Sequence, residues 1–164
     1  ASAMPQVWPG RGLPCLAMRQ AVQRMEAHVE HLCDQYGIEL VGSSARGRAI
    51  RWRGGRLEIS IPPIKGQVSY FIALHEIGHL VGRGRSAPRL ESEANAWVWA
   101  LQHAAVEPTP ATRRSIVRRL EGYLAWARNR QYRRVPPRIP EPTPVWPVWN
   151  SAIAPASAIA SYRG

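Results

Sequence analysis

The chain has 164 residues, which is enough for one domain with a substantial hydrophobic core. Its formal net charge of +11 is carried almost wholly by arginine and favours acidic protein or nucleic acid as a partner, although no nucleic-acid-binding motif accompanies the charge. No apolar segment is long enough to cross a membrane and no secretory signal pattern opens the chain, which argues against a membrane protein or a secreted degradative protease.

Residues 1–12 show no clear pattern, and we expect a flexible N-terminus. An amphipathic helix that ends at Gly37 is predicted next, because apolar residues recur at spacings of four and three. These residues are Met18, Val22, Met25, Val29, Leu32 and Tyr36. His28 and His31 lie beside this stripe, and we expect solvent-exposed histidines there rather than a metal-binding pair.

The two cysteines, Cys15 and Cys33, fall on this same predicted helix. About five helical turns, roughly 27 Å, separate them, so they cannot form a disulfide with each other. Free thiols suit a reducing compartment, and a cytoplasmic location is expected.

A small antiparallel sheet is predicted from a short strand at 38–41 and a hairpin at 49–61. The hairpin strands alternate apolar and polar residues around Gly54-Gly55, a pair suited to a two-residue turn. In that register the paired residues are Trp52 with Leu57, Ile50 with Ile59, and Arg51 with Glu58.

The next predicted helix, 67–81, contains His75-Glu76-Ile77-Gly78-His79, which matches the pattern His-Glu-x-x-His. Residues four apart lie on the same helix face, so His75 and His79 could bind one metal ion. Glu76 could then act on a water molecule as general base. Gly78 weakens the helix relative to alanine, and a close contact with neighbouring backbone would explain it.

A catalytic zinc site needs a third protein ligand and one open position. The following helix, predicted from Pro88 to about Ala105, offers Glu91 and Glu93 near its start. These two glutamates point about 200° apart on a helix, so only one of them can face the metal. The spacing alone does not choose between them.

The last predicted helix, about 111–133, has one apolar face and one basic face. The basic face is built from Arg113, Arg114, Arg118, Arg119, Arg128, Arg130, Arg133 and Arg134. A solvated surface is the usual meaning of such a charge run, and docking of acidic protein or nucleic acid is the alternative. Residues 135–164 are rich in proline and tryptophan, and we expect an extended or disordered tail.

His75-Glu-Ile-Gly-His79, followed by Glu91-Ser-Glu-Ala-Asn-Ala-Trp97, resembles the ImmA/IrrE-type metallopeptidase family. That family pairs His-Glu-x-x-His with a downstream Glu-x-x-Ala-Asn-x-Phe-Ala, and its first glutamate falls on Glu91. The resemblance covers about residues 14–108, with specific matches within 68–100. Trp97 replaces the usual phenylalanine, and the Leu-Leu-Met-Pro continuation of the family is missing.

The resemblance implies a zincin-like α+β fold over residues 13–134, with a small antiparallel sheet packed against helices. It also implies one zinc ion per chain, held by His75, His79 and Glu91, and a zinc-dependent endopeptidase of narrow specificity. The expected substrate is a regulatory protein such as a DNA-binding repressor. The alternative is a non-enzymatic, zinc-stabilised protein that binds a partner or nucleic acid through its arginine-rich helix.

Two further expectations concern the substrate. The strand Leu57–Ile61 could hold a peptide as an added strand if it lies at the sheet edge. A second donor to the oxyanion is expected from a tyrosine or histidine, and Tyr70, His103 and Tyr123 are candidates that the sequence does not rank.

Overall fold

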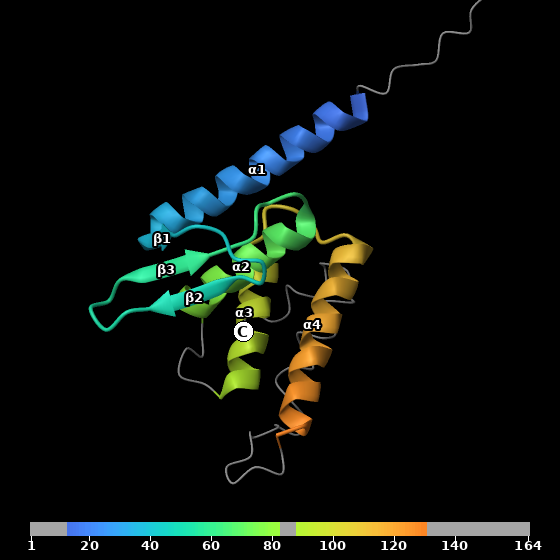
Figure 1. Ribbon diagram of the computed structural model, residues 1–164. Coiled ribbons are helices and arrows are strands. Elements are labelled where there is room, and N and C mark those ends of the chain that lie inside the picture. Colours follow the sequence, from blue (N-terminus) through green and yellow to red (C-terminus); the bar gives the residue numbers. More distant parts are fainter. Residues whose placement is uncertain (1–12, 83–87, 131–164) are drawn as a thin grey trace, which may run out of the picture.

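The computed structural model describes residues 13–82 and 88–130, which form four helices and one three-stranded sheet (Figure 1). In chain order the elements are α1 (Leu13–Tyr36), β1 (Ile38–Leu40), β2 (Arg48–Arg51), β3 (Leu57–Ser60), α2 (Gln67–Val81), α3 (Arg89–His103) and α4 (Pro110–Arg128). The predicted α+β class is confirmed. The N-terminus 1–12, the tail 135–164 and the end of the last predicted helix, 131–134, lie outside the described residues.

The sheet is mixed, so the prediction of a purely antiparallel sheet is wrong. Its strand order is β1-β3-β2, with β1 parallel to β3 and β2 antiparallel to β3. β3 is therefore the central strand, and β2 forms one edge. A peptide cannot add to β3, because both of its sides are already paired.

The hairpin between β2 and β3 differs by one residue from the predicted register. Trp52 N–H donates to the Arg56 carbonyl at 2.9 Å, which leaves a three-residue loop. Gly55 takes the positive φ of 86° that such a loop needs in its last position. The observed pairs are Arg48 with Ser60, Ala49 with Ile59, Ile50 with Glu58, and Arg51 with Leu57.

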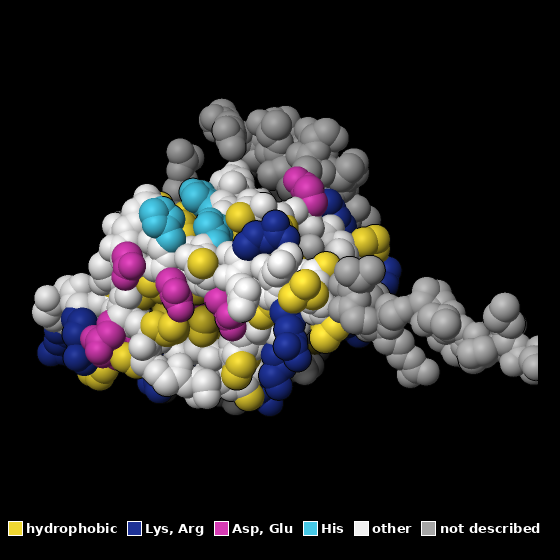
Figure 2. Space-filling model, turned by 90° about the horizontal axis from the view of Figure 1, so that it is seen from above, with side chains coloured by type: hydrophobic (Ala, Val, Ile, Leu, Met, Phe, Trp, Pro, Cys, Tyr) yellow, Lys and Arg dark blue, Asp and Glu magenta, His cyan; other side chains and the backbone are white. Residues whose placement is uncertain are grey.

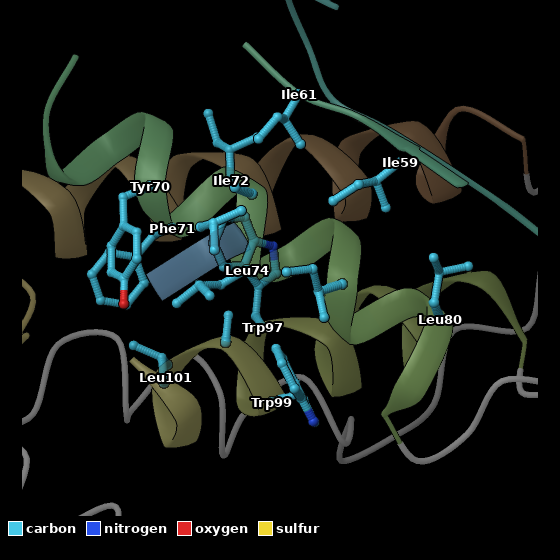
Figure 3. Close-up of a cluster of buried hydrophobic side chains, with 14 of the residues drawn as sticks. Ile59, Ile61, Tyr70, Phe71, Ile72, Leu74, Leu80, Trp97, Trp99 and Leu101 are labelled. Carbon is cyan, nitrogen blue, oxygen red and sulfur yellow. The ribbon is translucent and has the colours of Figure 1, made fainter. Parts of the chain in front are cut away.

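α2 is the central element and contacts all three other helices as well as β2 and β3. Its sequence is apolar on nearly every side, as a helix buried on all sides requires. Figure 3 shows side chains of α2 and α3 together in the core, below Ile59 of β3 and Ile61, which follows that strand. The buried side chains of α2 include Tyr70, Phe71, Leu74 and Ile77, as predicted.

α2 and α3 cross at very short range. A Cβ added to Gly78 would lie 2.7 Å from the carbonyl oxygen of Ala96, closer than real contacts allow. Only a residue without a side chain fits at this crossing. The expected backbone contact at Gly78 is therefore confirmed.

α1 ends at Gly37, whose φ of 62° stops the helix as predicted. Its C-terminal half packs on the core through Met25, Val29 and Leu32, whereas Met18 is exposed, contrary to the predicted stripe. Among the described residues no helix has the length and apolar character needed to cross a membrane.

The two cysteines are both free thiols, Cys15 exposed and Cys33 buried, in agreement with the prediction that they do not pair. Burial raises the pKa of Cys33 to about 11, and the neighbouring carboxylates of Asp34 and Glu30 act in the same direction. The Cys33 thiol is therefore protonated at neutral pH and poorly reactive.

The basic face of α4 is only partly a solvated surface. Arg114, Arg118 and Arg128 are exposed, as expected for a charge run. Arg113 instead donates to the Pro108 carbonyl at 3.2 Å, and Arg119 turns towards α2.

A substitution at Gly78 tests the close crossing of α2 and α3. We expect Gly78→Ala to lower the free energy of unfolding by about 1–3 kcal/mol, because the added methyl group meets the α3 backbone. Gly122→Ala is the matched control, since Gly122 lies in α4 with nothing within 4 Å of an added Cβ. It should stabilise the protein by about 0.5–1 kcal/mol. Urea unfolding of both variants measures the effects, and equal shifts would contradict the close crossing.

Candidate metal centre

Three side chains from α2 and α3 bring one ligand atom each to a common point. His79 Nε2 lies 3.0 Å from His75 Nε2, and Glu93 Oε2 lies 3.1 Å from the His75 nitrogen and 3.2 Å from the His79 nitrogen. Within residues 13–82 and 88–130, this is the group of histidine, cysteine and carboxylate side chains that could hold a metal ion. The predicted pairing of His75 with His79 is therefore present.

The third member of this group is Glu93, and the choice of Glu91 from the family resemblance is corrected. The reason is the close crossing of the two helices, which turns the Ala96 side of α3 towards α2. Glu93 lies one turn before Ala96 on that same side. Glu91 points about 200° away from Glu93 and so faces away from the histidines.

The donor set fits a zinc ion. Zinc binds imidazole nitrogen and carboxylate oxygen at about 2.0–2.2 Å, so neighbouring ligand atoms of a tetrahedral site are about 3.3–3.5 Å apart. The separations of 3.0–3.2 Å observed among His75, His79 and Glu93 come close to that value. Two imidazoles and one carboxylate also suit other divalent transition metals.

The outer ring nitrogens of the two histidines have different surroundings. His79 Nδ1 lies 3.5 Å from Ser92 Oγ, a distance at which only a weak hydrogen bond forms. His75 Nδ1 is buried and has no hydrogen-bond partner in the described part of the chain. The His75 ring is held instead by stacking on Trp97, with ring centroids 4.2 Å apart and planes at 27°.

Burial controls the charges of the ligands. Burial lowers the pKa of His75 to about 4, so this imidazole is neutral at pH 7, as a metal ligand must be. Burial alone would raise the pKa of Glu93, but hydrogen bonds from His75 and His79 hold it well below its usual range. Glu93 is therefore an anion, and it offers the one negative charge of the donor set.

Glu76 lies beside the three ligands, but its carboxylate does not belong to their group. Its carboxylate makes no hydrogen bond or ion pair with any described residue, and burial raises its pKa to about 7. The loop before β2 passes directly over it, since a Cβ on Gly47 would lie 2.5 Å from Glu76 Oε1. Gly47 also has a φ of 80°, so the backbone conformation favours glycine, and a side chain there would displace the Glu76 carboxylate.

An open cleft of about 1160 Å³ gives access to His75, His79, Glu76 and Glu93. Small-molecule pockets are about 300–1,000 Å³, so the space also suits a longer ligand. Its walls come from the loop before β2, β2 itself, α2, the start of α3, and α4. The remaining lining residues are Arg46, Gly47, Arg48, Ala49, Arg51, Leu80, Arg89, Arg119 and Tyr123.

The structure separates the three candidate oxyanion donors. Tyr123 lines the cleft, and burial together with the nearby Glu93 carboxylate raises its pKa. Tyr70 pairs instead with His28 Nδ1 at 2.7 Å and accepts from the Ala105 N–H at 2.9 Å. His103 stacks on Trp99 and bonds to its carbonyl. Tyr123 is therefore the candidate that can reach a substrate.

A second group of histidines lies on the α1 side of the molecule, where Figure 2 shows cyan side chains beside acidic ones. His28 is half-buried through its bond to Tyr70, whereas His31 is exposed as predicted. Burial lowers the pKa of His28, and the nearby His31 and His103 act in the same direction. These histidines do not form a metal-binding group with any described residue.

Comparison with protein-family models, curated proteins and solved structures finds no significant match to this chain. The likeness to the ImmA/IrrE-type family thus remains a prediction from the residues of α2 and α3. The candidate site is defined by the short distances among His75, His79 and Glu93.

The raised pKa of Glu76 predicts a specific pH dependence in metal-free protein. Since the pKa rises from 4.5 to about 7 on folding, the native state binds more protons than the unfolded state between these values. Wild-type stability should therefore fall as the pH rises through this range. Glu76→Gln removes the effect, so its stability advantage over wild type should grow by about 1–3 kcal/mol between pH 5 and pH 8. Urea unfolding with chelator present measures this, and an advantage independent of pH would contradict it.

Proposed function

We propose that this protein is a zinc-dependent endopeptidase. The observation that carries the proposal is the convergence of His75, His79 and Glu93 on one point in an open cleft, with the Glu76 carboxylate beside them. Three protein ligands and free access are what a catalytic zinc site needs, whereas structural zinc sites are closed by four protein ligands.

Zinc, when bound, supplies a Lewis acid that polarises a carbonyl group and acidifies a water molecule. Glu76 is placed to take a proton from the attacking water and to pass it to the leaving amine. No other described side chain occupies its carboxylate, and a pKa near neutrality suits a group that both accepts and releases a proton. Tyr123 keeps its proton at neutral pH and can donate a hydrogen bond to the developing oxyanion.

β2 offers an edge for an extended peptide. The hydrogen bond from Trp52 to Arg56 fixes the pairing pattern, so the backbone groups of residues 48 and 50 bond to β3. Those of Ala49 and Arg51 consequently point to the open edge. Because both residues also line the cleft, a peptide added there would pass the metal ligands.

The resemblance of α2 and α3 to the ImmA/IrrE-type family further suggests a regulatory protein, such as a DNA-binding repressor, as substrate. A non-enzymatic zinc protein that binds partners through the exposed arginines of α4 is the competing function. The open side of the metal group and the unpaired carboxylate of Glu76 favour the enzyme, since neither serves a structural zinc site.

Metal content tests the ligand set. Wild type purified without chelator and supplied with zinc should contain about one zinc ion per chain. Glu93→Ala should lose it, because the only anionic ligand is removed. Glu91→Ala is the matched control and should keep it. Elemental mass spectrometry gives the content, with circular dichroism to show that both variants fold. Loss of zinc in Glu91→Ala alone would restore the ligand set implied by the family.

Cleavage tests the role of Glu76. The zinc-loaded full chain is incubated with a peptide library prepared from a bacterial proteome, and new N-termini are identified by mass spectrometry. Glu76→Gln should retain zinc and lose cleavage by at least about 10²–10⁴-fold, the usual contribution of a general base. Equal cleavage by wild type and Glu76→Gln would refute the proposed mechanism and point to a contaminating protease.

A further inference from the structure

We propose that the cleft selects peptides with acidic side chains near the bond that is cut. This inference rests on the proposed function, and it specifies the substrate class of the same site. It starts from the charges that line the cleft. Among the described residues that line it, five are arginines and only Glu76 and Glu93 are acidic.

The carboxylates of Glu76 and Glu93 do not cancel the positive charge that these arginines present to a substrate. Glu93 directs one carboxylate oxygen at His75 and His79, and it is 3.9 Å from Arg89 through the other. Glu76 is buried at the floor of the cleft. A bound divalent ion would increase the positive charge further, so the field in the cleft attracts anionic groups.

Three of the arginines are available for a ligand. Within the described ranges, Arg46, Arg48 and Arg119 make no ion pair and no hydrogen bond through their side chains. The other two have structural contacts. Arg51 donates to the Leu80 carbonyl at 2.7 Å, and Arg89 lies over the Trp126 ring at 4.5 Å.

The available arginines lie on opposite sides of the metal ligands. Arg46 and Arg48 belong to the loop and the start of the edge strand β2, whereas Arg119 belongs to α4. α2, which carries the histidines, runs between β2 and α4 (Figure 1). An extended peptide along β2 therefore has positive charge from Arg46 and Arg48 on the side of the strand and from Arg119 on the side of α4.

A peptide fits these features better than nucleic acid does. Single strands bind through stacking on aromatic side chains, and Tyr123 is the one aromatic residue among the described lining residues. The open strand edge can pair with the N–H and C=O groups of a peptide backbone. Nucleic acid lacks this alternation of backbone donors and acceptors. Phosphodiester cleavage commonly uses two metal ions, whereas this group offers one donor set.

The library digest described above also tests this inference when the sequences around the cut bonds are compared with the library composition. We expect Asp and Glu to be enriched at least about threefold near the cut bonds. The double variant Arg46→Gln/Arg48→Gln should lower the ratio of the cleavage rates of acidic and neutral peptides about tenfold. Arg114→Gln/Arg118→Gln is the matched control, since these arginines are exposed on α4 outside the cleft lining. It should behave as wild type.

The outcomes separate this inference from the proposed function. Cleavage without acidic enrichment would overturn the inference and leave the peptidase standing. If nothing is cut, binding decides: a fluorescein-labelled Glu-Ala peptide should bind the zinc-loaded protein at least about tenfold more tightly than its Lys-Ala counterpart. Loss of that preference in Arg46→Gln/Arg48→Gln would support the acidic-peptide cleft although the peptidase proposal had failed. Equal binding of both peptides, or binding of duplex DNA alone, would overturn the inference.

Discussion

The close crossing of α2 and α3 is the constraint on which the candidate site depends. Gly78 lets the Ala96 backbone approach α2 so nearly that any side chain would collide with it. This contact lies between the two turns that carry His75 and His79, and it therefore fixes which side of α3 the histidines meet. With the helices further apart, the Glu93 carboxylate would not reach both imidazoles. The close packing of α2 on α3 thus determines which residues form the site. The absence of a side chain at Gly78 makes that packing possible.

The same core explains the unusual electrostatics of the site. α2 is surrounded by apolar side chains, so His75 and Glu76 are removed from water by the residues that stabilise the fold. Burial then favours the neutral forms of both, and only Glu93, hydrogen bonded by two histidines, keeps its charge. The result is a donor set with a neutral His75 imidazole and one anion, which suits a divalent cation.

The sequence predicted the elements well because each has a strong local signal. The spacing of apolar residues located the helices, and Gly37 ended α1 as expected. The sequence-based predictions failed where contacts between segments distant in the chain determine the structure. The parallel pairing of β1 with β3 joins residues that are 19 apart in the chain, such as Ile38 and Leu57, and no local pattern encodes it. The choice of Glu93 over Glu91 depended on the rotation of α3 about its axis, which the Gly78 crossing sets. The presence of Gly78 within an otherwise good helix was the one local clue to that crossing.

Several polar groups at the site are poorly satisfied, and this has a consequence for stability. The buried Nδ1 of His75 and the buried Nε1 of Trp97 have no hydrogen-bond partner among the described residues. Unpaired buried groups of this kind each destabilise a fold by about 1–3 kcal/mol. A fold optimised for stability alone would replace them with apolar side chains of similar size. Their presence next to a three-ligand donor set is therefore better explained by chemistry at the cleft, and metal binding would return part of the lost stability by binding only the folded state.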